Sequence, residues 1–231
     1  MKYFGASLSE KHAALGKLIR KKDSAEEAKR LFSEIHAQLN MPQVYGLSQT
    51  EAGELLSSFS DAEFRVMPTA KDETAAWIVW HLARIEDVTM NILVAQGGQV
   101  FDDSWKSRVC STVADTGNAM SDDEIMEFSK SVDVRELIAY RNAVAVRTRE
   151  IVQRLTAEDM RRRVSADDIE KVRECGAVTE AEDSVWLLDY WGGKDVAGLL
   201  LMPPTRHAIM HLNACARIKQ QLLRGKKPYR S

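Results

Sequence analysis

Four long segments of this chain repeat their apolar residues every three or four positions, and this period constrains the fold more than any other feature. The segments run from Ser24 to Leu39, Asp72 to Gln96, Asp133 to Leu155 and Pro203 to Leu223. Such spacing places apolar side chains on one face of an α-helix, whereas a half-buried strand needs strict alternation. No segment alternates convincingly, and no hairpin signal or internal repeat is present. We therefore expect an all-α protein, a four-helix bundle with short extra helices.

Local signals predict where these helices begin and end. Capping-box spacings open helices at Ser7 and Ser24, and Asp133 caps the third long segment. Gly97 and Gly98 end the second long helix, and Pro203-Pro204 opens the last, because proline is tolerated in a first turn. Shorter helical or apolar pieces are expected at 7–19, about 50–59, about 122–128, 184–191 and 195–202.

The segments between the helices suggest how the chain is divided. We predict an N-terminal helical extension at 1–23, a bundle at 24–224 with a charged surface insert at 157–183, and a basic tail at 225–231. The connection at 97–131 is long and rich in turn residues, so not every neighbouring pair of helices is expected to form a simple antiparallel hairpin.

Charge and cysteine usage limit the classes of partner. A formal net charge of -2 over 231 residues gives no reason to expect nucleic acid or an anionic membrane as the main partner. Three cysteines without a CxxC pair favour a reducing compartment. The N-terminus lacks the apolar core of a signal peptide, and no apolar run approaches the roughly 18–20 residues that span a bilayer. We expect a cytoplasmic protein.

Two histidines in the last long segment are the strongest chemical signal. His207 and His211 are four residues apart, so a helix places both on the apolar stripe that also carries Cys215. His81 lies beside the apolar stripe of the second long helix. Buried imidazoles without partners cost about 1–3 kcal/mol each, and a shared transition metal is one way to satisfy them. Zinc, nickel, iron and manganese are equally compatible. The alternative is that these histidines are polar core residues without a metal.

The last helix does not carry the motif of a metalloprotease. No glutamate follows His207, so the general base of an HExxH helix is missing. Glu86 lies about 140° round the helix from His81, which makes it an awkward ligand. It can orient a histidine, but a solvated carboxylate is the favoured interpretation, and the case for Asp87 is weaker still.

Other residues have both a chemical and a structural interpretation. Arg141 can bind a substrate carboxylate, but a side chain that extends along the edge of the core is favoured. Cys215 can be a ligand or nucleophile, and a small core residue is the better interpretation. His36 is a spare ligand if its helix reaches the bundle centre, and His12 is expected at the surface. The tryptophans beside His81, Trp77 and Trp80, either line a pocket or pack in the core.

Two stretches resemble a known family. Trp80-His-Leu-Ala-Arg-Ile-Glu86, preceded by the segment 55–68, resembles the first metal-histidine segment of the DinB-like superfamily, and residues 206–218 resemble its closing His-x3-His helix. The resemblance spans roughly residues 24–223. It implies an up-down-down-up four-helix bundle, a divalent metal on His81, His207 and His211, and often a homodimer. Members with known activity include transferases and isomerases that use mycothiol, bacillithiol or glutathione-like thiols, while many others have no assigned reaction. The N-terminal extension and the 157–183 insert depart from this pattern, so the substrate pocket need not match.

These observations predict a metal-dependent enzyme acting on a small electrophilic molecule. A metal on the three histidines lowers the pKa of a bound water or thiol. Thiol-dependent S-transfer, with a low-molecular-weight thiol as cofactor, is the first hypothesis, and metal-assisted hydrolysis is the second. The alternative from a different class is a non-catalytic helical binding or stress-response protein, whose metal is structural or absent.

Overall fold

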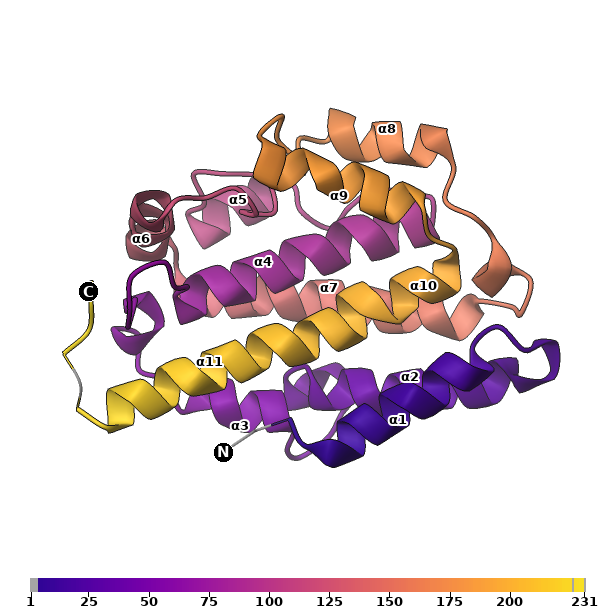
Figure 1. The fold of residues 1–231 in the computed structure, drawn as a ribbon, viewed down its shortest axis with the longest axis horizontal. Helices are drawn as coiled ribbons and strands as arrows, with labels where there is room; N and C mark the ends of the chain where they lie inside the picture. Colours follow the sequence, from indigo (N-terminus) through magenta and orange to yellow (C-terminus); the bar gives the residue numbers. More distant parts are fainter. Residues whose placement is uncertain (1–3, 226, 231) are drawn as a thin grey trace.

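The computed structural model describes residues 4–225 and 227–230, and its regular structure is helical throughout (Figure 1). Two isolated β-bridges join Met67 to Arg230 and Arg163 to Asp195. The prediction of an all-α protein is therefore confirmed. The α-helices are α1 Ala6–Leu18, α2 Ala25–Gln38, α3 Glu51–Ser57, α4 Ala75–Asp87, α5 Asp103–Val109, α6 Asp122–Ser131, α7 Val134–Arg154, α8 Ala166–Glu174, α9 Glu182–Gly192, α10 Val196–Leu200 and α11 Ala208–Leu223. Short 3-10 turns lie at Lys22–Ser24, Pro42–Val44, Glu63–Arg65 and Asp159–Arg161.

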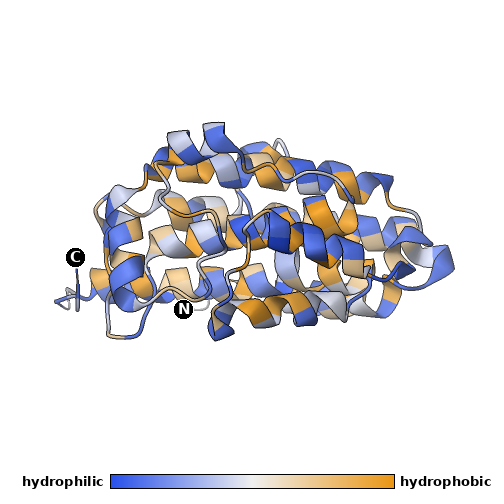
Figure 2. Ribbon diagram, turned by 90° about the horizontal axis from the view of Figure 1, so that it is seen from above, coloured by the Kyte–Doolittle hydropathy of each residue, from blue (hydrophilic) through white to orange (hydrophobic). Residues whose placement is uncertain are grey.

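Helix α4 is the central element of the bundle. It packs against α7 and α11, and every residue from Ala75 to Asp87 is buried (Figure 1). Helix α6 also contacts α4, and α5 packs against α7. Helices α8 and α9 lie above α4 in the same view. Stripes of apolar residues run along the helices in Figure 2, as expected for helices that bury one face. The up-down-down-up order of the four long helices stays a prediction.

The predicted N-terminal extension packs against the bundle. Helix α1 contacts α2, and its side chains Leu8 and Leu15, with Ile19 just beyond, belong to the hydrophobic core. Residues 1–3 of that prediction lie outside the described residues.

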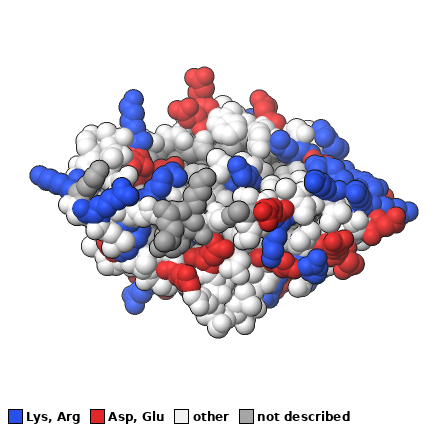
Figure 3. Space-filling model, turned by 60° about the horizontal axis from the view of Figure 1, so that its bottom comes forward, with Lys and Arg blue, Asp and Glu red and all other residues white. Residues whose placement is uncertain are grey.

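The surface in Figure 3 carries acidic and basic side chains side by side. Across the described residues, no helix has both the length and the apolar character required to cross a bilayer.

The last long helix, α11, begins at Ala208, later than the predicted start at Pro203. Pro203 and Pro204 do not open it but lie within a π-helical turn, Met202–His207, that joins α10 to α11. Neither proline has an N–H, so the ordinary α-helical bonds to the preceding turn are lost. Instead, the Thr205 hydroxyl donates to the Leu200 carbonyl at 2.9 Å. The ring of His12, which is half-buried rather than at the surface, donates from Nε2 to the Leu201 carbonyl at 2.8 Å.

The segment predicted to be weakly structured contains two helices. Helix α6 begins with a complete capping box between Ser121 and Glu124. Helix α5, capped by the Asp102 side chain, was not expected, because a seven-residue helix is too short to show a clear period. The charged 157–183 insert also contains a helix, α8, whose Val172 is fully buried against the rest of the protein.

Candidate metal site

The three predicted histidines converge on one point, although they come from two distant segments. His81 lies on α4, His207 ends the π-helical turn, and His211 lies in the first turn of α11. The His81 ring centre is 5.0 Å from that of His207 and 4.9 Å from that of His211, and the last two are 4.5 Å apart. Each residue offers one ring nitrogen within 4.8 Å of the other two.

The spacing of these nitrogens fits a metal ion. The Nε2 atoms of His81 and His207 are 3.1 Å apart. Two nitrogens that each lie ~2.1 Å from one ion are roughly 3.0 Å apart at a right angle and roughly 3.4 Å apart in a tetrahedron. Two further ring atoms, Nδ1 of His207 and of His211, are buried without a hydrogen-bond partner among the described residues. The donor set is therefore one that a divalent transition metal would suit.

The protonation state of His81 follows from its surroundings. Its Nδ1 lies 2.8 Å from the Thr116 carbonyl oxygen. Because a carbonyl only accepts, Nδ1 must donate, which leaves the lone pair of Nε2 directed toward His207. Burial lowers the pKa of His81 to about 3, with a further contribution from His211, while the Thr116 carbonyl opposes the shift. Burial, His81 and His211 also lower the pKa of His207 well below its ordinary value. Both rings are therefore neutral at pH 7, the form that binds metals.

Three consecutive carbonyls of the loop between α5 and α6 hold the side chains of α4. Trp80 Nε1 donates to the Asp115 oxygen at 3.0 Å, and Trp77 Nε1 donates to the Gly117 oxygen at 3.2 Å. The intervening Thr116 oxygen binds His81, as described above, and the Thr116 N–H donates to the Ala177 oxygen at 2.9 Å. This loop therefore fixes the orientation of the first histidine.

Replacing Gly117 by alanine is expected to disturb the site and destabilise the fold by about 1–3 kcal/mol. Gly117 has φ +73°, and a Cβ atom there would lie 2.8 Å from Trp77 Nε1. Both the left-handed backbone and the close approach therefore require glycine. The measurement is the free energy of unfolding in urea. Gly176→Ala is the matched control, since Gly176 has φ +68° but a Cβ atom there would meet no atom within 4 Å. An equal effect of the two substitutions would show that the Trp77 contact does not matter.

The carboxylate of Glu73 lies close to the ring of His211. Glu73 Oε2 lies 3.6 Å from His211 Nδ1, slightly beyond hydrogen-bond length. Carboxylates in this position orient metal-binding histidines. Glu73, Trp77 and His81 are four residues apart, and Trp77 stacks on His81 with ring centres 4.6 Å apart. Glu73 was not predicted, although this spacing was visible in the sequence.

The histidines form part of the wall of a cavity of about 450 Å³. Its other walls are mainly apolar and aromatic, with Trp77 and Ile85 from α4 and Trp186 and Trp191 from α9. Catalytic metal sites typically have three protein ligands and one position open to substrate, whereas structural sites are closed by four. The cluster has three histidines and adjoins a cavity, which is the first of these arrangements.

Glu86 and His36 form a separate buried contact. The interpretation of Glu86 as a solvated carboxylate is wrong, because it is 4% exposed and its Oε1 lies 2.8 Å from His36 Nε2. Burial alone would raise the pKa of Glu86, but His36 and Arg141 hold it below its ordinary value. Since His36 binds Glu86 and, through Nδ1, the hydroxyl of Tyr45 at 2.9 Å, it does not join the three histidines. The prediction assumed that one face of the helix that carries Glu86 is exposed to solvent. It failed because every residue of α4 is buried.

Arg141 and Cys215 are also buried. The interpretation of Arg141 as a side chain at the edge of the core is wrong, since it is 3% exposed and donates to the Leu39 carbonyl at 2.6 Å. Cys215 is fully buried, and burial raises the pKa of its thiol to about 12, although Arg141 opposes the shift. A thiol of this kind is a core residue rather than a nucleophile. Trp80 is fully buried in the core, whereas Trp77 lines the cavity.

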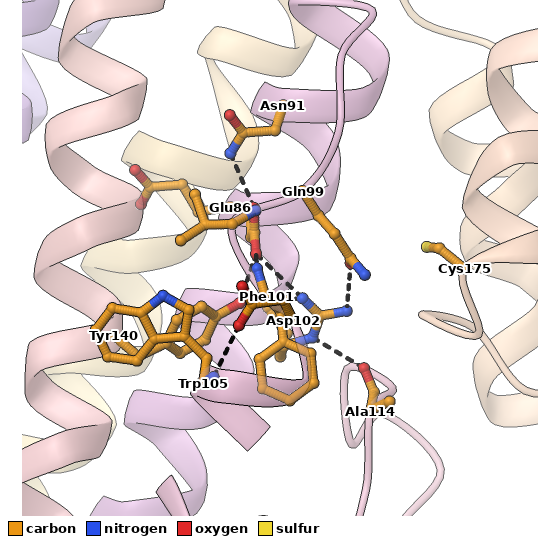
Figure 4. A network of polar contacts seen from close by, with 12 residues as sticks. Glu86, Asn91, Gln99, Phe101, Asp102, Trp105, Ala114, Tyr140 and Cys175 are labelled. Carbon is orange, nitrogen blue, oxygen red and sulfur yellow. Dashed lines mark hydrogen bonds and ion pairs between the residues drawn. The ribbon is translucent and has the colours of Figure 1, made fainter. Parts of the chain in front are cut away.

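Asp87 belongs to a buried polar network, part of which Figure 4 shows around Gln99, Ala114 and Tyr140. Both Asp87 and Arg84 are fully buried, with an N···O distance of 3.2 Å. Arg84 also binds Gln99, Tyr140 and the Ala114 carbonyl. Through the bond from Arg84 to the Ala114 carbonyl, the network ties α4 to the loop that holds His81.

Comparison with known proteins adds a family to this geometry. A family model described as the DinB superfamily matches residues 47–184, more than half of the chain. The matched segment contains His81 and the loop whose carbonyls hold it, but ends before His207 and His211. No curated protein matches the chain.

Proposed function

Since this chain belongs to the DinB superfamily, we propose that it is a metal-dependent enzyme in which His81, His207 and His211 hold a divalent metal. The observation that carries the proposal is the convergence of three imidazole nitrogens, within 4.8 Å of one another, on the wall of a cavity of about 450 Å³. Neutral rings are already available there, because burial lowers the pKa of His81 and of His207.

Each group around the cluster has a definite part in this proposal. A bound zinc, nickel, iron or manganese ion would act as a Lewis acid and lower the pKa of a water or thiol. The Thr116 carbonyl keeps the proton of His81 on Nδ1, so that Nε2 remains free to bind. Glu73, 3.6 Å from His211 Nδ1, would orient that ring once the site is filled, and the stacked ring of Trp77 covers one face of His81.

The reaction that we propose is thiol-dependent S-transfer to a small electrophile, with metal-assisted hydrolysis as the second possibility. Both need an ionised nucleophile beside an apolar cavity that holds the electrophile. A low-molecular-weight thiol and a homodimer are part of the same proposal, because the family resemblance implies them. A cytoplasmic location is proposed from the three cysteines without a CxxC pair. The competing proposal, a non-catalytic protein with a structural metal, would require a fourth protein ligand.

Elemental analysis of untagged protein tests the metal site. We expect about one transition-metal ion per chain in the wild type, and loss of that ion in both His81→Ala and His207→Ala. His12→Ala is the matched control and should retain the metal, because His12 binds a backbone carbonyl elsewhere. Protein that contains no metal, and takes up none when zinc, nickel or manganese is added, would contradict the proposal. Metal-loaded protein is then assayed on electrophiles with and without thiols, which separates transfer from hydrolysis.

A further inference from the structure

One face of helix α9 forms the outer wall of the cavity. Trp186, Leu187, Tyr190 and Trp191 line it, and their spacing places them on the same side of the helix. Trp186 is 48% exposed. Its position is nevertheless fixed, because its Nε1 donates to the Asp183 carbonyl at 3.1 Å and its ring packs edge-on against that of Tyr190, with ring centres 5.7 Å apart. Trp186 is therefore held at the edge of the cavity although its ring is not buried in the core, so core packing does not explain its position.

The polar side chains that line the cavity are one carboxylate, the amide of Asn118, the hydroxyl of Tyr190 and the three histidine rings. Glu73 contributes a carboxylate, which only accepts hydrogen bonds. Asn118 donates one of its two amide N–H groups to the Asp183 carbonyl, so its oxygen and its second N–H remain for a ligand. The N–H groups of Trp77 and Trp186 are already bound to backbone carbonyls.

Among the residues that the structure describes, no lysine or arginine lines the cavity. The Lys194 ammonium lies 4.2 Å from the centre of the Tyr190 ring but does not line the cavity. Arg206, next to His207 in the chain, lines a different groove together with Phe4 and Met210. A ligand carboxylate placed against these walls, away from the histidines, would lose its hydration, find no lysine or arginine and face Glu73.

We propose that the cavity selects a flat, uncharged aromatic molecule that carries a hydrogen-bond donor, and that it disfavours carboxylates. This inference rests on the proposed function and names the chemical class of its electrophilic substrate. The rings of Trp77, Trp186, Tyr190 and Trp191 provide apolar stacking surfaces, and Glu73 and Asn118 accept the donor. A volume of about 450 Å³ accommodates one molecule of two fused rings.

Titration calorimetry with non-reacting probes tests this class of ligand. The probes are 2-naphthol, its methyl ether and 2-naphthoate, measured at pH 7 on metal-free full-length protein, so that direct binding of a carboxylate to metal does not interfere. We expect naphthol to bind about three- to ten-fold more tightly than the ether, because the ether lacks the donor. Naphthoate should bind at least about ten-fold more weakly than naphthol. Equal affinity for naphthol and naphthoate, or no binding of naphthol, would overturn the inference.

Two variants locate the binding to the cavity. Trp186→Ala is expected to weaken naphthol binding by about ten-fold, whereas Tyr229→Ala, which removes an exposed aromatic ring outside this cavity, should leave it unchanged. Glu73→Gln should reduce the difference in affinity between naphthol and naphthoate, because it removes the negative charge of the carboxylate. Unchanged naphthol binding in Trp186→Ala would show that the ligand lies elsewhere and would overturn the inference.

Metal uptake by the same preparations distinguishes the two proposals. Naphthol binding with the expected selectivity, in protein that takes up no metal, would refute the proposed enzyme but support the ligand class. Normal metal uptake without naphthol binding would refute the ligand class and leave the metal site intact.

Discussion

Replacing Asp87 by alanine is expected to lower the free energy of unfolding by about 3–5 kcal/mol, a large part of the stability of a typical domain. Asp87 is fully buried and accepts five hydrogen bonds. The donors are Arg84, Asn91, the backbone N–H groups of Val100 and Phe101, and the Tyr140 hydroxyl. Without the carboxylate, the buried guanidinium of Arg84 keeps its charge and loses its counter-charge.

The experiment is urea unfolding of Asp87→Ala beside the double variant Arg84→Met/Asp87→Ala. Removing one member of a buried ion pair is usually more damaging than removing both, because no uncompensated charge then remains in the interior. We therefore expect the double variant to recover part of the lost stability. If Asp87→Ala is too unstable to purify, the recovery is measured as soluble yield and thermal midpoint of the double variant. A single variant within about 1 kcal/mol of the wild type would contradict this account.

Acid is expected to destabilise the metal-free protein through the same histidines that we propose as ligands. The pKa of His81 is about 3 in the folded protein, against about 6.5 for an unfolded chain. Below pH 6.5 the unfolded chain therefore takes up a proton that the folded protein refuses. The contribution of a neutral buried histidine to the free energy of unfolding is fully present above pH 6.5. It is lost as the pH falls toward 3, by up to about 1.4 kcal/mol per pH unit for each such histidine. The lowered pKa of His207 acts in the same direction.

The free energy of unfolding, measured at a series of pH values in the presence of a chelator, checks this expectation. Because many carboxylates also titrate in acid, the relevant quantity is the difference between the wild type and His81→Asn. Asparagine does not titrate, and its amide retains a donor for the Thr116 carbonyl. Between pH 6 and pH 4 the wild type should lose about 2–3 kcal/mol more than the variant. Parallel curves would mean that His81 is not held neutral by burial.

The helices and the pairing of His207 with His211 could be predicted from the sequence, because both depend on local rules, whereas the addition of His81 rested on its place beside an apolar stripe and on the resemblance to a known family. Apolar period, capping residues and breakers act over a few positions, so α2 and α7 were predicted close to their observed bounds. The second and the last long helices were also predicted, but each includes a π-helical segment, Val88–Val94 after α4 and Met202–His207 before α11. The stacking of His207 and His211 follows from a spacing of four, and their rings lie 4.5 Å apart. Helix α5 and the π-helical turn at the two prolines were missed, because a short helix has no clear period and a wide turn resembles a helix start.

Only the tertiary structure decided which polar residues are buried and what they bind. Glu86 contacts His36 across 50 positions, and Asp87 contacts Tyr140 across 53. In an isolated amphipathic helix the face that carries these carboxylates would meet water, but α4 is surrounded by other helices and buries every face. The carbonyls that orient His81 and the aromatic wall from α9 are likewise brought to the site by folding over distances that no local pattern reports. Spacing therefore determined that His207 and His211 meet, whereas packing around α4 decided that His81 joins them and what surrounds all three.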